Sequence, residues 1–200
     1  MDRGDWDRRW ERRAAEGRLH TAQILVAEVS HLPPRRALDL ACGAGRNAVW
    51  LAERGWQVTA VDFSPVALAM ARAHAAERGV EVEWVEADLR AYEPPAKSFD
   101  LVLVLYLHLP AQERRAVLAR AARALAPGGT FLLVGHDLAN LGTNAPGPSD
   151  PDVLYTPEDI VRELPDLRVI RAQRVARPVS FDDQQAVAID ALVRAVSIPA

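Results

Sequence analysis

The strongest constraint on the fold is a regular alternation of short apolar segments with helical segments between residues 36 and 137. Strands are expected over 36–41, 57–63, 80–88, 99–109 and 130–137, and helices over 45–55, 66–79 and 111–125. Strand–helix–strand alternation produces a parallel sheet with right-handed crossovers, because each helix must pack back onto the sheet it leaves. The pattern therefore predicts an α/β, Rossmann-like doubly wound sheet with helices on both faces.

Local signals mark the ends of these elements. Ser64 and Pro65 provide an N-cap and a first-turn proline for one helix, and Gly79 closes it. Pro110 opens the next helix, and the run Pro127–Gly129 is expected to stop it.

The two ends of the chain differ from the central alternation. Residues 2–32 have a helical pattern throughout. After a loop rich in Pro, Gly and Asn, over 140–153, a short helix is expected at 156–164. Two apolar segments, 166–179 and 185–196, are separated by a polar turn and indicate a hairpin. The complete sheet should have seven strands, with an antiparallel C-terminal hairpin.

Composition narrows the possible partners. The 200 residues carry a net charge of −3, which gives no basic field to attract nucleic acid or an anionic membrane. Cys42 is the only cysteine, and no histidine or carboxylate pair has metal-ligand spacing, so no disulfide or metal site is expected. No apolar run is long enough to span a bilayer. These features predict a cytoplasmic protein and leave its oligomeric state open.

The candidate site lies where the expected parallel strands end, since ligands of doubly wound sheets bind beyond the carboxyl ends of the strands. The first strand leads into LDLACGAGRN, whose spaced Gly43 and Gly45 loosely satisfy the dinucleotide pattern G-x-G-x-x-G/A. Asp39, however, lies in the strand before this loop, and Asp62 and Asp88 end the next two strands. The two phosphates of NAD would lie close to Asp39, an unfavourable arrangement of like charges.

Each of the three carboxylates suits one part of a phosphate-free adenosine. Asp62 can accept hydrogen bonds from both ribose hydroxyls. Asp88, with the backbone around Ala87 and Leu89, can accept one from the adenine amino group. Asp39 is suited to an ammonium group or a bridging water. The sulfonium of S-adenosylmethionine is compatible with these carboxylates, so this cofactor fits better than NAD.

Four segments resemble class I S-adenosylmethionine-dependent methyltransferases: ALDLACGAGRNAVWLAERGWQVTAVDFSPVALAMA, EADL, FDLVLVLYLHLP and ALAPGGTFLLVGHD. More narrowly, they are similar to the small bacterial tellurite-resistance and thiopurine-type enzymes. Ala41 replaces the first glycine of the family's acid-x-Gly-x-Gly-x-Gly motif. The resemblance implies that the Leu105 carbonyl faces the methionine amine. The predicted cofactor contacts are Asp39, Gly43, Gly45, Arg46, Asn47, Asp62, Phe63, Ala87, Asp88, Leu89 and Leu105.

Arg46 and Asn47 are assigned to the methionine carboxylate because they start a helix, although a solvated first turn is the alternative. Three acceptor-side candidates follow strands: Tyr106, His108 and His136. A hydroxyl acceptor needs a general base such as histidine, whereas a thiolate does not. Structural roles for both histidines, and packing for Tyr106, remain open. Trp6 and Trp10 either cover the site or anchor the first helix.

The resemblance implies methyl transfer, and residues 105–110 lack the Asn/Asp-Pro-Pro-aromatic motif of base and glutamine methyltransferases. A small-molecule acceptor is therefore expected, with sulfur, selenium or tellurium, oxygen or nitrogen as the methylated atom. A non-catalytic cofactor-binding or scaffold module is the alternative, and a nicotinamide-dependent oxidoreductase is less favoured. Residues 1–200 are expected to form one domain: a helical cap (1–34), a cofactor-binding core (35–137), and an acceptor loop with the hairpin (138–200).

Overall fold

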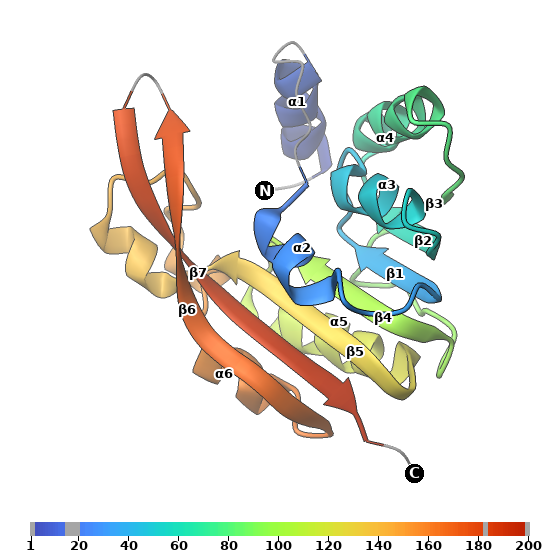
Figure 1. Ribbon diagram of the computed structural model, residues 1–200. Helices are drawn as coiled ribbons and strands as arrows, with labels where there is room; N and C mark the ends of the chain where they lie inside the picture. The colour runs from blue at the N-terminus through green and yellow to red at the C-terminus, as the bar shows by residue number, and fades with distance from the viewer. Residues whose placement is uncertain (1–2, 15–20, 182–183, 199–200) are drawn as a thin grey trace.

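The computed structural model describes residues 3–14, 21–181 and 184–198, and its centre is one seven-stranded sheet (Figure 1). The strands are β1 (Arg36–Leu40), β2 (Gln57–Asp62), β3 (Glu83–Glu86), β4 (Phe99–Leu105), β5 (Leu125–His136), β6 (Leu167–Phe181) and β7 (Gln184–Ser197). Their order is β3-β2-β1-β4-β5-β7-β6. The first five strands run parallel, while β7 is antiparallel to both β5 and β6. The predicted doubly wound sheet with an antiparallel hairpin is confirmed.

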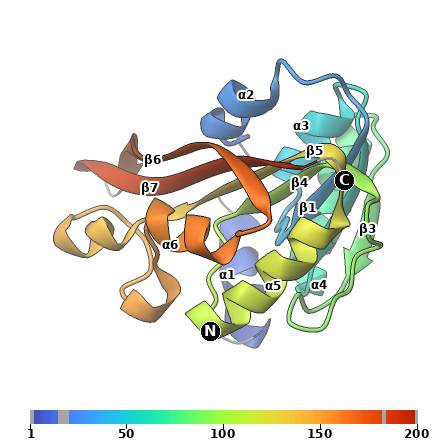
Figure 2. The same cartoon turned by 90° about the horizontal axis from the view of Figure 1, so that it is seen from below.

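The helices are α1 (Arg3–Ala14), α2 (Gln23–Val29), α3 (Arg46–Ala52), α4 (Pro65–Glu77), α5 (Ala111–Ala124) and α6 (Pro157–Glu163). Two 3₁₀ turns, η1 (Leu138–Gly142) and η2 (Pro151–Val153), lie in the loop after β5. In Figure 2, α2 and α3 lie on one side of the sheet, and α5 and α6 lie on the other. As predicted, the Ser64 side chain caps α4, where it accepts a hydrogen bond from the Ala67 N–H.

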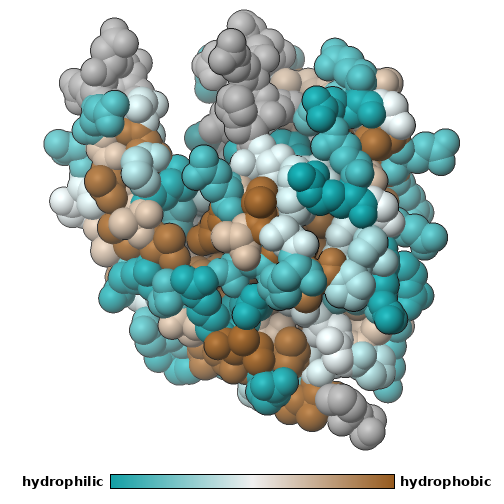
Figure 3. All heavy atoms as spheres, in the orientation of Figure 1, coloured by the Kyte–Doolittle hydropathy of each residue, from teal (hydrophilic) through white to brown (hydrophobic). Residues whose placement is uncertain are grey.

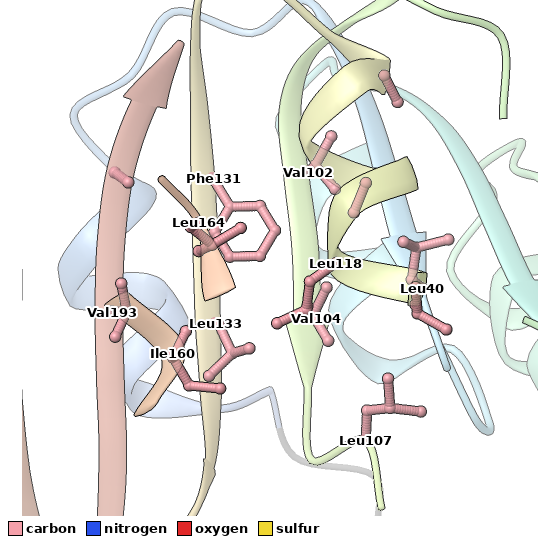
Figure 4. Close-up of a cluster of buried hydrophobic side chains, with 14 of the residues drawn as sticks. Leu40, Val102, Val104, Leu107, Leu118, Phe131, Leu133, Ile160, Leu164 and Val193 are labelled. Carbon is pink, nitrogen blue, oxygen red and sulfur yellow. The ribbon is translucent and has the colours of Figure 1, made fainter. Parts of the chain in front are cut away.

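The two-residue alternation of the strands gives each face of the sheet its own buried cluster. Val102 and Val104 of β4 pack with Leu118 of α5 and Ile160 of α6, and Figure 4 shows this cluster. Leu101 and Leu103 of the same strand point to the opposite face, where the buried cluster includes residues of α2, α3 and α4. The central strands are therefore covered on both sides, and only their ends remain for a site.

The prediction of one helix over residues 2–32 is wrong for the described part of this segment. Residues 15–20 lie outside the described residues, but Thr21 and Ala22 are not helical, and α2 starts at Gln23. The Ala22 N–H donates to the Asn47 side-chain oxygen at 3.1 Å, and the Thr21 hydroxyl donates to the Arg46 carbonyl at 3.3 Å. These hydrogen bonds fix the chain in an extended form on the start of α3.

Three of the parallel strands also differ from their predicted bounds. β3 covers only Glu83–Glu86 of the expected strand 80–88. β4 ends at Leu105 rather than continuing to residue 109, because Tyr106 has a positive φ of 59° that turns the chain out of the sheet. β5 begins at Leu125, which pairs with Phe99, so the Pro127–Gly129 run lies inside the strand. A register shift between Phe99 and Leu101 accommodates this irregular start.

The hairpin β6–β7 extends past the end of the other strands as a twisted arm (Figure 1). α1 stands between this arm and α4, beyond the sheet. In the same orientation, Figure 3 shows a hollow between the arm and the body of the protein, where hydrophobic and hydrophilic residues lie side by side. The hairpin and α1 thus form walls around the strand ends where the candidate site was predicted.

Candidate functional site

A cavity of about 1260 Å³ lies at the carboxyl ends of β1 and β4. It is enclosed by the glycine loop, α1, α2, α4 and the hairpin. Eight of the predicted site residues line it: Gly43, Arg46, Asn47, Asp62, Leu105, Tyr106, His108 and His136. The other predicted contacts, which are Asp39, Gly45, Phe63, Ala87, Asp88 and Leu89, are not among its lining residues.

The glycine loop connects β1 to α3 in a conformation that favours glycine. Gly43 and Gly45 have φ values of 55° and 76°. A Cβ atom on Gly43 would lie 2.6 Å from the Trp10 ring, and one on Gly45 would lie 2.6 Å from the Trp84 ring. The Gly43 N–H donates to the Asp62 carboxylate at 2.8 Å, which ties the loop to the end of β2. Both glycines are therefore required by backbone conformation and by close packing.

Asp62 is a nearly buried carboxylate on the cavity wall. Its oxygens accept hydrogen bonds from the backbone N–H groups of Gly43 and Ser64, the latter at 3.0 Å. Burial raises the pKa of Asp62, and these backbone hydrogen bonds oppose the shift. Since each carboxylate oxygen has more than one acceptor site, Asp62 can still accept hydrogen bonds from a ligand hydroxyl.

Asp39 lies directly behind the glycine loop and is 1% exposed. Its Oδ2 atom is buried and has no hydrogen-bond partner among the described residues. Burial raises the pKa of Asp39 to about 7, although the positive charge of Arg46 lowers it. A buried carboxylate oxygen with unused acceptor capacity next to a glycine cradle fits a cationic ligand or a water bound between them.

Asp88 follows β3 and has a side chain that is 35% exposed. Its carboxylate binds Arg90, whose backbone N–H and guanidinium donate at 2.9 Å and 2.6 Å. Hydrogen bonding to Arg90 lowers the pKa of Asp88. The backbone of Ala87 is fixed by a hydrogen bond from its N–H to the Asp62 carbonyl. The assignment of Asp88 to adenine remains a prediction, and it would require adenine to share this carboxylate with Arg90.

Arg46 and Asn47 start α3 at the cavity wall. The Asn47 side-chain oxygen is already used by the Ala22 N–H, so this residue holds the N-terminal segment against α3. The Arg46 guanidinium lies 5.9 Å from the centre of the Tyr106 ring. Arg46 therefore lies between the glycine loop and the acceptor-side residues.

Both tryptophans of α1 line the cavity, so the helix is anchored and covers the site at the same time. Trp10 packs on Gly43, and Trp6 stacks on His108 with ring centres 5.8 Å apart. A further contact joins the Ser64 hydroxyl to the Asp7 carboxylate. This contact connects α1 to the N-cap of α4.

We expect replacement of Ser64 by alanine to lower the free energy of unfolding by about 1 kcal/mol, which is about 3 °C in Tm. The change removes the N-cap of α4 and the hydrogen bond to Asp7 together. Thermal unfolding measures the effect. The matched control is Ser98→Ala, which removes only an exposed hydrogen bond to the Ala96 carbonyl and should leave Tm within 1 °C. Equal Tm values for the two variants would contradict the prediction.

The acceptor-side candidates form one aromatic cluster. His108 and His136 stack with their ring centres 5.5 Å apart, and Tyr106 lies 5.2 Å from His136. The sequence interpretation missed Asp190 of β7 and Arg177 of β6, which complete this cluster. Asp190 is 1% exposed, and the Tyr106 hydroxyl donates to it at 2.9 Å. A single aspartate inside the apolar run AVAIDALV was the available sequence signal.

The described residues contain no group of three or more His, Cys, Asp or Glu side chains arranged to hold a metal ion. Cys42 is buried, and burial raises the pKa of its thiol. No helix within the described ranges combines the length and apolar character needed to cross a membrane.

Residues 37–129 match the family described as "Methyltransferase domain". A demethylmenaquinone methyltransferase of Thermus thermophilus is 38% identical over 130 residues. This alignment covers 64% of the present chain and 54% of the relative, so the chain spans about half of that protein's length.

Solved structures extend the similarity to most of the chain. TehB from Haemophilus influenzae superposes with a TM-score of 0.74 at 17% identity, covering 88% of this chain and 62% of TehB. The N-methyltransferase NodS from Bradyrhizobium japonicum, solved with S-adenosyl-L-homocysteine, gives a TM-score of 0.66 at 21% identity and covers 88% and 84% of the two chains. The matched domain contains the glycine loop and the acidic strand ends described above. Residues 37–129 are therefore similar to a methyltransferase domain, and the chain shares the fold of TehB and NodS.

Proposed function

We propose that this protein transfers the methyl group of S-adenosylmethionine to a small-molecule acceptor. The observation that carries the proposal is the unpartnered, buried Oδ2 of Asp39 behind a glycine loop whose other side opens on the cavity. Together with Asp62, it places two carboxylates next to the glycine loop. This arrangement favours a cationic, phosphate-free adenosine over a dinucleotide.

The cofactor would lie along the glycine loop, held by the predicted contacts. Asp62 would bind the ribose hydroxyls, and Asp39 would stabilise the ammonium group directly or through a water. Arg46 would face the methionine carboxylate, and the Leu105 carbonyl would accept from the amine. When bound, the cofactor supplies an electrophilic methyl group on a sulfonium. The protein then has to orient the acceptor and exclude water, which is the task of the cavity walls.

The cavity size supports a small acceptor bound beside the cofactor. Its volume of about 1260 Å³ exceeds the 300–1000 Å³ typical of a site for one small ligand. Residues of the hairpin and of α2 form part of its lining. The net charge of −3 supports an enzyme without a nucleic-acid partner. We also propose that the enzyme acts in the cytoplasm. We also propose that residues 1–200 act as one domain, with the cap 1–34 and the segment 138–200 enclosing the acceptor.

Isothermal titration with S-adenosylmethionine and S-adenosylhomocysteine tests cofactor binding, and we expect both to bind. An acceptor panel of phenols, thiols, amines and chalcogen oxyanions, read by release of S-adenosylhomocysteine, tests transfer. If neither S-adenosylmethionine nor S-adenosylhomocysteine binds, the proposal is contradicted. Binding without turnover on any acceptor would favour a cofactor-binding module instead.

A further inference from the structure

His136 differs from the other acceptor-side candidates because a buried carboxylate lies behind it. It is the last residue of β5, and its Nδ1 atom lies 3.7 Å from Oδ1 of Asp190 on the neighbouring strand β7. The side chain is 12% exposed and lines the cavity. Since Nδ1 faces Asp190, the opposite ring nitrogen, Nε2, is the one left for a group in the cavity.

Asp190 is itself held in place from two sides. The Tyr106 hydroxyl donates to Oδ2 at 2.9 Å, and the Arg177 guanidinium donates to both oxygens at 2.6 Å and 3.2 Å. The carboxylate is thereby oriented by partners from β6 and from the residue after β4. At 3.7 Å, Asp190 does not form a hydrogen bond with Nδ1 of His136, but its negative charge favours the protonated imidazole that forms when His136 accepts a proton.

The other two candidates are less suited to accept a proton. Tyr106 donates its own proton to Asp190, and burial together with that carboxylate raises its pKa, so the phenol stays protonated. His108 has Trp6 stacked on it at 5.8 Å and His136 at 5.5 Å, with the rings nearly parallel in both pairs. His108 therefore separates the indole from His136 and supports the position of the His136 ring.

Burial, together with two nearby arginines, favours the neutral form of the His136 ring. Burial lowers the pKa of His136, Asp190 opposes this effect, and the positive charges of Arg177 and Arg9 add to it. Tyr106 and His108 contact the ring as well. A neutral imidazole is the form that can accept a proton.

Part of the cavity wall formed by α2 and the hairpin is apolar, although Glu28, Arg171 and Arg177 also line it. Ile24 and Ala27 of α2, together with Val175, Ala176, Pro178 and Leu192 of the hairpin, line the same cavity. Such a wall suits an acceptor with an apolar body, with one polar atom directed to the histidine. A phenol has an ordinary pKa near 10, close enough to that of an imidazole for efficient proton transfer, whereas an aliphatic alcohol is a far weaker acid.

We propose that the acceptor is a phenolic hydroxyl on an apolar body, that His136 is its general base, and that Asp190 is the positioning residue for His136. The proposal rests on the proposed methyltransferase function. The phenol proton moves to Nε2 of His136 while the phenol oxygen forms a bond to the methyl carbon. The carbon–sulfur bond breaks, and its electron pair stays on sulfur, so the sulfonium becomes the neutral thioether of S-adenosylhomocysteine. The proton later leaves His136 for solvent.

The test uses the full chain and a series of substituted phenols with pKa values between about 7 and 10, beside a thiol of low pKa. We expect His136→Gln to lower kcat on the pKa 10 phenol by about 100-fold or more, and on the pKa 7 phenol by less than about 10-fold. Thiol methylation and the Kd for S-adenosylmethionine should remain within about threefold. A loss that is the same for all phenols, or no loss, would overturn the assignment of the base.

The variant Asp190→Asn tests whether Asp190 acts through His136 rather than on the acceptor itself. Without the carboxylate, the pKa of His136 falls, so the acidic limb of the kcat profile should move to lower pH while the kcat plateau drops about tenfold. An unchanged pH profile would overturn the role of Asp190. The matched controls His31→Gln and Asp100→Asn lie outside the cavity and should behave as wild type. A wild-type enzyme that methylates only thiols would overturn the acceptor class, whereas failure to bind S-adenosylmethionine would overturn the proposed function itself.

Discussion

Replacing Asp62 with alanine should weaken binding of S-adenosylmethionine by about 2 kcal/mol, or about 30-fold in Kd. Two losses combine in this variant. The cofactor would lose charge-assisted hydrogen bonds from its ribose hydroxyls. In addition, the Gly43 N–H would lose the carboxylate that holds it at 2.8 Å, so the glycine loop would have to be ordered during binding.

Isothermal titration at pH 8 measures the effect, with Asp100→Ala as the matched control. Asp100 belongs to β4, is partly buried, and accepts a hydrogen bond from the Arg36 N–H at 3.2 Å, at the opposite end of the sheet. Both variants lose an aspartate that accepts a hydrogen bond from a backbone N–H. Only Asp62 is predicted to contact the cofactor. An unchanged Kd in Asp62→Ala, or an equal loss in both variants, would remove Asp62 from the cofactor site.

The doubly wound parallel sheet and the acidic strand ends could be predicted because they depend on local patterns. The alternation of apolar segments and helices specifies right-handed crossovers, which bring the ends of β1 and β2 to one edge of the sheet. The placement of Asp39 and Asp62 near each other at this edge follows from that topology alone. The family resemblance then suggested S-adenosylmethionine, and the comparisons support the same class.

The acceptor side could not be predicted in the same way, because it is assembled by contacts between distant segments. Asp190 and Tyr106 are 84 positions apart, and the pairing of β7 with β5 brings Asp190 to this end of the sheet. The register of the hairpin then places Arg177 near the same carboxylate. Likewise, no local pattern indicated that Thr21 and Ala22 would be extended. Their hydrogen bonds to the start of α3 override the helical propensity of the segment.

Cofactor affinity should depend on pH through Asp39, and more strongly in the wild type than in Asp39→Asn. The pKa of Asp39 is raised to about 7 in the protein without cofactor, mainly by burial. A cationic cofactor binds better when the carboxylate is charged, so Kd should increase as pH falls below about 7, by at most about tenfold per pH unit. Asp62, whose pKa is also raised, remains in both proteins, so the difference between them isolates Asp39.

The stability of the protein without cofactor should change in the opposite direction. The folded-state pKa of Asp39 lies above its ordinary value of 3.8, so between about pH 4 and pH 7 the folded protein binds more protons than the unfolded chain. The contribution of Asp39 to stability is therefore lost as pH rises through this range, by at most about 1.4 kcal/mol per pH unit. At pH 8, Asp39→Asn should unfold at a higher temperature than the wild type and yet bind S-adenosylmethionine more weakly.

Titrations near pH 7 in two buffers with different ionisation enthalpies test this coupling directly. Because the positive cofactor lowers the pKa of Asp39, binding should release a fraction of a proton, and the observed enthalpy should differ between the buffers. Asp39→Asn should abolish most of that difference. If the two proteins release the same number of protons, Asp39 does not respond to the cofactor charge. If Asp39→Asn is less stable than the wild type at pH 8, the buried carboxylate is satisfied by a partner and does not carry a desolvation cost that cofactor binding relieves.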